Sequence, residues 1–135
     1  MMVRPSPEAA SVPGVLICDD DDAMRMLLSE VVGTSPRLRV VGEAADGNEA
    51  VVEAVRLRPS VILLDLAMPN RSGFEALPDL RRAAPEAQII VLSGFADSSV
   101  AEQVIARGAA GYLEKGVPPD TIVGTIEQAL ANNPG

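Results

Sequence analysis

Short, continuously apolar runs recur along this chain and alternate with amphipathic segments. The clearest runs are residues 15–18, 61–64 and 89–92, and weaker ones follow at 38–44 and 111–113. A strand without alternating polar positions is buried on both faces, which is typical of a parallel sheet covered by helices on each side. Five strand–helix units in succession therefore predict one doubly wound α/β domain with a five-stranded parallel sheet.

The segments between the apolar runs carry helical periodicity and helix-end signals. Predicted helices include a segment with Leu27, Leu28, Val31 and Val32 on its apolar side, then residues 47–57, 74–84, 98–107 and 120–130. We expect Asp120 to cap the last helix and Gly108 to follow the fourth, and the ordinary alternative for the acidic run is a solvated loop in which Asp22 caps the first helix. Pro78 should limit the third helix, because proline is tolerated only in a first turn.

The domain boundaries follow from the same pattern. Residues 1–14 contain three prolines and no long apolar stretch, so we expect a flexible tail rather than a signal peptide. Residues 15–131 should form the folded domain, and 132–135 a linker or the end of the chain.

Composition excludes several classes of function. The chain has no histidine, which rules out Ser-His-Asp and Cys-His catalysis, imidazole zinc sites and a phosphohistidine on this chain. Cys18 is the single cysteine, so no internal disulfide forms and a cytoplasmic location is expected. A net charge of −8 argues against direct binding to nucleic acid or to an anionic membrane.

Polar side chains follow four of the predicted strands. Residues 19–22 are four consecutive aspartates, Asp65 ends the third strand, Ser93 ends the fourth, and Lys115 comes just after the fifth. Each has an ordinary alternative, such as a helix cap, a turn hydroxyl or a solvated lysine. Because the carboxyl ends of parallel strands meet at one edge, we expect these groups to converge there.

This set of groups fits one kind of chemistry. Clustered carboxylates repel each other unless a hard cation such as Mg²⁺ lies among them. An aspartate can attack phosphorus to form an aspartyl phosphate, and a lysine, a hydroxyl and a metal then neutralise the transferred group. Since the chain has no histidine, the phosphoryl group must come from another molecule.

The residues resemble the receiver domain of bacterial two-component response regulators, of the type that the chemotaxis regulator represents. The resemblance covers the chain from about Val15 to Leu130. It rests on four motifs in order: VLICDDDDAMR at 15–25, VILLDLAMPNRSGFEAL at 61–77, IIVLSG at 89–94 and GAAGYLEK at 108–115. It implies a flavodoxin-like (βα)5 fold with strand order 2-1-3-4-5.

The resemblance also assigns the metal and phosphorylation sites. Asp65 matches the residue that is phosphorylated. Asp19 and Asp20 match the acidic pair that holds Mg²⁺, with Asp20 as a direct ligand and Asp19 acting mostly through water. The backbone carbonyl of Ala67 would be a further ligand.

The remaining matches concern switching. Ser93 matches the switch hydroxyl, Tyr112 the switch aromatic and Lys115 the lysine that pairs with the phosphate. The resemblance implies that phosphorylation changes the surface of the fourth helix, fifth strand and fifth helix. That surface, which we expect to include Val100, Gln103 and Val104, would bind a partner or a second copy of the chain.

Two positions depart from the family pattern. Gly116 replaces the proline that usually follows the lysine, so a cis peptide bond there is not assumed. Ala67 has no polar side chain where some relatives place one to hold the attacking water. With the bulky Phe95, this leads us to expect slow self-dephosphorylation.

The implied partners are a sensor histidine kinase as phosphodonor and a C-terminal helix-turn-helix output domain beyond Gly135, which indicates transcription regulation. We expect a signalling domain rather than a turnover enzyme.

Three alternatives remain open. One is a phosphorylation-independent interaction module, another an aspartate-nucleophile hydrolase of the haloacid dehalogenase type, and the third a flavodoxin-like cofactor binder. Against the hydrolase, Ala23 stands where a threonine or valine is expected and no cap domain is expected in this chain; against the cofactor binder, four consecutive aspartates would repel the phosphate of the cofactor.

Overall fold

Five parallel strands form a single sheet in the order β2-β1-β3-β4-β5. The computed structural model describes residues 12–94 and 98–132, so most of the predicted tail, Phe95 and residues 133–135 lie outside it. The strands are β1 (Gly14–Cys18), β2 (Arg39–Ala44), β3 (Val61–Asp65), β4 (Gln88–Ser93) and β5 (Gly111–Glu114). The predicted α/β fold class and strand order are confirmed.

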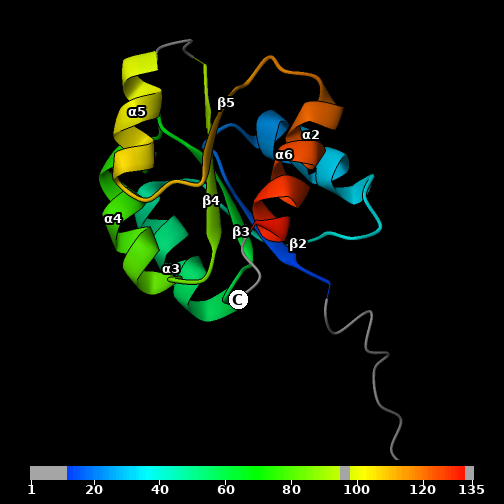
Figure 1. Ribbon diagram of the computed structural model, residues 1–135. Coiled ribbons are helices and arrows are strands. Elements are labelled where there is room, and N and C mark those ends of the chain that lie inside the picture. Colours follow the sequence, from blue (N-terminus) through cyan, green and yellow to red (C-terminus); the bar gives the residue numbers. More distant parts are fainter. Residues whose placement is uncertain (1–11, 95–97, 133–135) are drawn as a thin grey trace, which may run out of the picture.

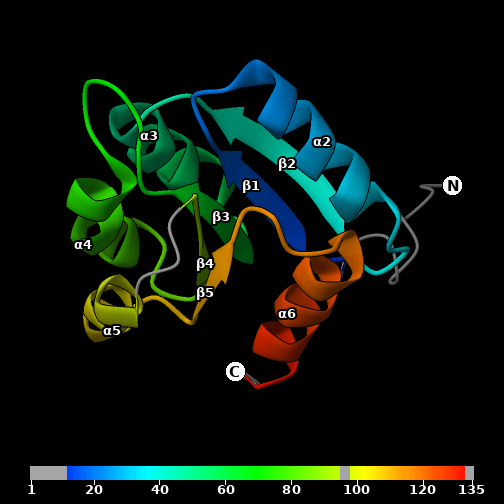
Figure 2. The same ribbon diagram turned by 90° about the horizontal axis from the view of Figure 1, so that it is seen from above.

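Helices cover both faces of the sheet (Figures 1 and 2). The helices are α2 (Asp22–Gly33), α3 (Gly47–Leu57), α4 (Gly73–Ala83), α5 (Ser98–Ala106) and α6 (Pro119–Ala131). Helices α2 and α6 lie on one face, and α3, α4 and α5 on the other (Figure 2). None of the helices among residues 12–94 and 98–132 has the length and apolar character needed to cross a membrane.

The two faces of the sheet give two hydrophobic clusters. On β1, Leu16 and Cys18 face the cluster under α3, α4 and α5, whereas Val15 and Ile17 face the cluster under α2 and α6. Every residue of β1 and β3 is buried. Burial of this apolar area is the main favourable term in folding, at roughly 25 cal/mol per Å². The sheet is thus a rigid platform for the groups at the ends of its strands.

Several helix-end predictions were wrong in detail. Asp21, not Asp22, caps α2, because its side chain accepts the amide of Ala23 at 2.9 Å. Asp120 lies in the first turn of α6 rather than at its cap, and Pro118 takes the N-cap position without a side-chain hydrogen bond. Gly108 follows α5 with a φ of 107°, in the left-handed region where the prediction placed it.

Tertiary packing explains the other corrections. Pro78 lies inside α4, which begins at a capping box between Ser72 and Glu75 and buries Leu77 and Leu80. The cap and the buried leucines offset the backbone hydrogen bond that proline cannot donate.

Two apolar positions also differ from the expectation. Leu27 is 49% exposed rather than in the core. Val104, which was expected at the partner surface, is fully buried, whereas Gln103 is exposed. Both differences arise because periodicity alone does not give the rotation of a helix against the sheet.

Gly73 occupies the tightest position that bears on the strand ends. A Cβ atom there would lie 2.0 Å from the carbonyl oxygen of Asp65. Gly124, in the middle of α6, has no atom within 4 Å of the equivalent Cβ position. The two glycines therefore make a matched pair for testing this packing.

We expect Gly73→Ala to lower the free energy of unfolding by about 3 kcal/mol, because backbone must move to admit the methyl group. Gly124→Ala should instead raise it by roughly 0.5–1 kcal/mol through better helix propensity. Urea unfolding followed by circular dichroism measures both. A Gly73→Ala protein as stable as the wild type would contradict the predicted clash.

Candidate functional site

The predicted polar groups do converge at the carboxyl edge of the sheet. Asp19 and Asp20 follow β1, Asp65 ends β3, Ser93 ends β4 and Lys115 follows β5. Parallel pairing of β1 with β3, β3 with β4 and β4 with β5 brings these ends together. A hydrogen bond of 2.8 Å from the amide of Lys115 to the carbonyl of Ser93 continues the pairing beyond β5.

Lys115 bridges two buried carboxylates. Its Nζ lies 2.9 Å from Oδ2 of Asp19 and 3.1 Å from Oδ2 of Asp65. The side chains of Asp19 and Asp65 are 1% and 4% exposed, and that of Lys115 is 23% exposed. The contact between Oδ2 of Asp19 and the ammonium group is an ion pair that does not satisfy the geometry of a hydrogen bond. The single ammonium group of Lys115 thus pairs with two buried carboxylates. When both carboxylates are ionised, a net negative charge remains in a region with little access to water.

The environment of Asp65 disfavours its charged form. Burial raises the pKa of the Asp65 carboxyl above its ordinary value, and the nearby charge of Asp19 adds to the effect. The amide of Ala67, which donates to Oδ1 of Asp65 at 3.2 Å, and the ammonium of Lys115 oppose the rise without cancelling it. A carboxyl with a raised pKa at a strand end is a typical functional group.

Lys115 responds to the same pair in the opposite sense. Burial on its own would lower the pKa of its ammonium group, but the contacts with Asp19 and Asp65 outweigh burial and raise the pKa. Lys115 therefore stays positively charged at neutral pH. It is suited to hold an additional negative group at this edge.

The acidic cluster fits a divalent cation. Asp19, Asp20 and Asp65 each offer a carboxylate oxygen, and these oxygens lie within 4.8 Å of one another. Asp20 is exposed while the other two are buried, so the cluster opens to solvent on one side. Hard cations such as Mg²⁺ prefer oxygen ligands and retain some of their water. A cation here would also compensate the charge that Lys115 leaves unbalanced.

The structure places the other predicted residues on the neighbouring strands and the loops that follow them. Ser93 is buried and lies opposite Glu114 in the sheet register. Tyr112 lies opposite Val91 on β4 and packs against the cluster under α3, α4 and α5. Ala67 is exposed in the loop after β3. The peptide bond between Lys115 and Gly116 is trans.

Arg25 is a contact that the sequence analysis did not assign. Its Nη1 donates to the backbone carbonyl of Asp19 at 2.6 Å, and its Nε lies 3.2 Å from Glu43 on β2. The guanidinium also pairs with Asp22. Arg25 thus fixes the backbone of the acidic loop at Asp19, and its guanidinium pairs with Asp22 and Glu43 rather than with the carboxylates of Asp19, Asp20 or Asp65. Its position in the first turns of α2, directly after an acidic run, is the signal that could have pointed to this role.

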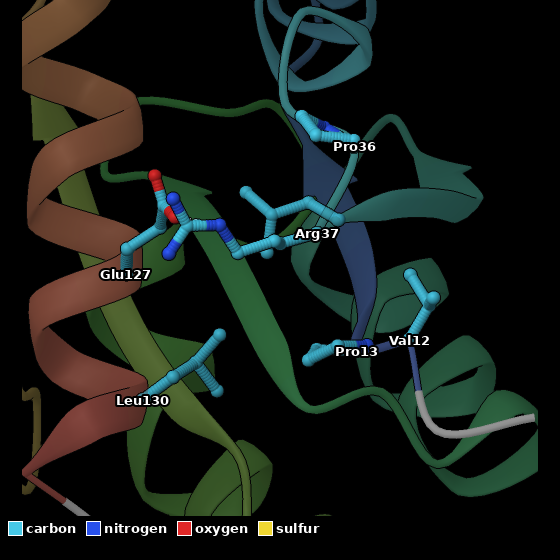
Figure 3. A pocket seen from close by; sticks show the side chains of 7 residues that line it. Val12, Pro13, Pro36, Arg37, Glu127 and Leu130 are labelled. Atoms are coloured by element: carbon cyan, nitrogen blue, oxygen red, sulfur yellow. Dashed lines mark ion pairs between the residues drawn. The ribbon is translucent and has the colours of Figure 1, made fainter. Parts of the chain in front are cut away.

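Two cavities differ in their position relative to the acidic cluster. A small one of about 110 Å³ adjoins Lys115 and is lined mainly by apolar side chains of α2 and α6. A larger one of about 440 Å³ lies at the opposite edge of the sheet, near the starts of β1 and β2 (Figure 3). Arg37 and Glu127 form an ion pair of 3.4 Å across it. None of the predicted site residues lines the larger cavity.

The comparisons with known proteins point to one family. Residues 15–127 match the family model described as "Response regulator receiver domain". The chain is 39% identical over 120 residues to the transcriptional regulatory protein LiaR of Bacillus subtilis, which covers 89% of this chain and 57% of LiaR. The chain spans about half the length of most of the curated relatives it matches.

Solved structures agree with this match. The response regulator domain of Thermotoga maritima CheB superposes with a TM-score of 0.83 at 30% identity, covering 89% of this chain and 97% of that one. A response regulator of Burkholderia pseudomallei, described as having a phosphorylated aspartic acid, a calcium ion and citrate, has a TM-score of 0.77 at 25% identity. That match covers 89% of this chain and 69% of the Burkholderia chain.

The raised pKa of Asp65 predicts a pH-dependent cost to stability. In a folded protein whose carboxyl pKa is raised, the native state binds the proton more tightly than the unfolded state, so stability falls as pH rises above the ordinary value. We expect Asp65→Asn, without divalent cations, to raise the thermal midpoint at pH 7.5 by about 3 °C. The gain should be smaller at pH 5. Circular dichroism melts at both pH values measure it, and a lower midpoint for Asp65→Asn at pH 7.5 would contradict the expectation.

Proposed function

The chain belongs to the response regulator receiver domain family, and from this membership we propose that it accepts a phosphoryl group on Asp65 from a sensor histidine kinase. The observation that carries the proposal is the buried Asp65 carboxylate, held beside Asp19 and Asp20 and paired with Lys115. The phosphorylated aspartic acid described for the Burkholderia relative supports the same chemistry. We assign this activity to residues 15–131 as the receiver unit.

The proposed reaction is a transfer of one phosphoryl group. A carboxylate oxygen of Asp65 forms a bond to phosphorus, and the bond between phosphorus and the histidine nitrogen of the kinase breaks. The electron pair of that bond stays on the leaving nitrogen. Lys115 neutralises charge on the transferred group, since it already lies 3.1 Å from Oδ2 of Asp65. The domain is phosphorylated stoichiometrically and is not a turnover enzyme.

We further propose that Mg²⁺ binds among Asp19, Asp20 and Asp65, with the backbone carbonyl of Ala67 as another ligand. The three carboxylates provide the oxygen donors and the excess negative charge that such a cation requires. When bound, Mg²⁺ supplies charge neutralisation for the transferred phosphoryl group. Arg25 donates a hydrogen bond to the backbone carbonyl of Asp19 and so fixes the loop that carries the carboxylates of Asp19 and Asp20.

Switching is proposed to begin at Ser93 and Lys115. The dianion formed on Asp65 attracts the hydroxyl of Ser93 and the ammonium of Lys115, and so draws the end of β4 toward it. Tyr112, opposite Val91, then changes its packing against the cluster under α5. The affected surface consists of α5, β5 and α6.

The α5–β5–α6 surface is the proposed partner or homodimer face. Gln103 is exposed on α5, and Ile105 on the same helix is 48% exposed. The name of LiaR supports a role in transcription regulation, exerted through a helix-turn-helix output domain rather than through direct nucleic-acid binding by this domain. The proposed location is the cytoplasm, where the kinase domain would present its phosphohistidine.

Phosphorylation is tested by incubating the chain with acetyl phosphate and measuring its intact mass. We expect the wild type to gain one phosphoryl group in Mg²⁺ and far less in EDTA, because charge neutralisation at the carboxylates is needed. Asp65→Asn should gain none. Lys115→Gln should react at least tenfold more slowly, as expected for loss of one positioned charge.

The contrary outcomes identify the alternatives. A folded wild type that takes no phosphoryl group from acetyl phosphate or from a histidine kinase would favour a phosphorylation-independent interaction module. Continuous release of phosphate from a small phosphomonoester would instead indicate a hydrolase. The circular dichroism spectrum of each variant serves as the control for folding.

The lifetime of the phosphoryl group tests the expectation of slow self-dephosphorylation. Ala67 offers no side-chain group to orient water, so we expect a half-life of minutes or longer. Ala67→Asn should shorten the half-life by about tenfold, since it introduces an amide that can position the water. The decay of the phosphorylated mass after removal of the donor gives both values, and a wild-type half-life of seconds would refute the expectation.

A further inference from the structure

The loop between β3 and α4 is fixed at its base beside Asp65. The amide of Gly73 donates to the carbonyl of Leu66 at 3.0 Å and closes the loop. The amide of Ala67 donates to Oδ1 of Asp65 at 3.2 Å, so the first peptide units after β3 fold back over the carboxylate. Ala67 is exposed between this base and the tip of the loop.

The tip of the same loop is fixed by a different part of the molecule. Nδ2 of Asn70 donates to Oδ2 of Asp46 at 3.0 Å, and the amide of Gly47 donates to the carbonyl of Arg71 at 2.8 Å. Asp46 and Gly47 form the start of α3, beside which the loop passes (Figure 2). A Cβ atom on Gly47 would lie 2.7 Å from the Arg71 carbonyl oxygen, so the loop and the helix are in close contact.

Asn70 and Asp46 are well suited to this contact. Asn70 has a φ of 64°, a left-handed conformation that asparagine tolerates better than most side chains. Oδ1 of Asp46 accepts a hydrogen bond of 2.8 Å from the amide of Glu49 and so caps α3, while Oδ2 of Asp46 accepts the hydrogen bond from Nδ2 of Asn70. These two hydrogen bonds lower the pKa of Asp46, so it is an ionised acceptor at neutral pH.

We propose that Asn70 and Asp46 are positioning residues for the divalent-cation site, because their hydrogen bond holds the tip of the loop that begins at Asp65 and carries Ala67, whose backbone carbonyl is a proposed ligand. The inference rests on the proposed function, which places a cation at Asp19, Asp20 and Asp65. Neither residue would itself be a ligand of the cation. Partners of this kind, one step removed from the ligands, commonly set metal affinity.

The main test measures Mg²⁺ affinity of the unphosphorylated chain by titration calorimetry. Asn70→Gly removes the amide but keeps a residue that adopts a positive φ without strain. We expect its dissociation constant to rise about three- to tenfold, as for the loss of one hydrogen bond. Arg56→Gln, which removes an ion pair with Glu53 within α3, is the control and should leave the constant unchanged.

A charge-matched exchange tests the pair directly. Asn70→Asp alone sets two carboxylates against each other and should weaken Mg²⁺ binding, although its added negative charge would by itself strengthen it. Combining Asn70→Asp with Asp46→Asn exchanges donor and acceptor, retains a capping side chain at position 46 and restores the net charge. We expect the double variant to return to within about twofold of the wild-type constant.

The outcomes separate this inference from the proposed function. A wild type that binds Mg²⁺ and takes up a phosphoryl group, with Asn70→Gly binding equally well, would overturn the positioning role alone. So would thermal midpoints that fall in Asn70→Gly and Asn70→Asp without any change in the dissociation constant, since that pattern indicates a merely structural contact. Failure of the double variant to recover affinity would also overturn it. A wild type that neither binds Mg²⁺ nor accepts a phosphoryl group would overturn both proposals.

Discussion

The burial of two carboxylates beside a single ammonium group is the interaction on which the rest of this structure depends. Asp19 and Asp65 are almost fully removed from water, and Lys115 contacts both. Such an arrangement is costly in free energy, because each buried charge loses hydration and like charges repel. It persists because the sheet is buried on both faces and its strand ends cannot move apart without exposing the core. The rigid sheet is thus what maintains the excess negative charge.

That excess charge links stability to function. An ionised Asp65 destabilises the empty domain, and any cation bound at the carboxylates relieves the same repulsion. A phosphoryl group on Asp65 would change the balance again by adding negative charge, which Lys115 and the cation together must compensate. The groups that make the domain less stable are therefore those to which the proposed function assigns the response, a common trade-off at functional sites.

The sequence predicted the sheet and the central residues of the site because both depend on local signals. Continuous apolar runs mark buried strands, and residues that directly follow such runs, such as Asp65 and Lys115, must lie at the sheet edge. The roles of these residues are assigned by family resemblance and by the proposal. What could not be predicted depends on contacts between distant segments. Asn70 and Asp46 are 24 residues apart, and neither one indicates the other. The errors at Leu27 and Val104 have a related cause, since the rotation of a helix is set by what it packs against.

These distant contacts divide the domain at β3. On one side, Glu43 of β2 forms an ion pair with Arg25, and Arg25 donates a hydrogen bond to the Asp19 carbonyl. Asp46, directly before α3, accepts a hydrogen bond from the loop that carries Ala67. These anchors come from α2, β2 and the start of α3. On the other side, Ser93 and Lys115 follow β4 and β5, toward the surface where Tyr112 lies. If the cation site is to stay in place while the phosphoryl group moves Ser93 and Lys115, its anchors must come from elements that do not take part in the movement. The placement of the anchors on α2, on β2, which is the edge strand opposite β5, and at the start of α3 meets that requirement.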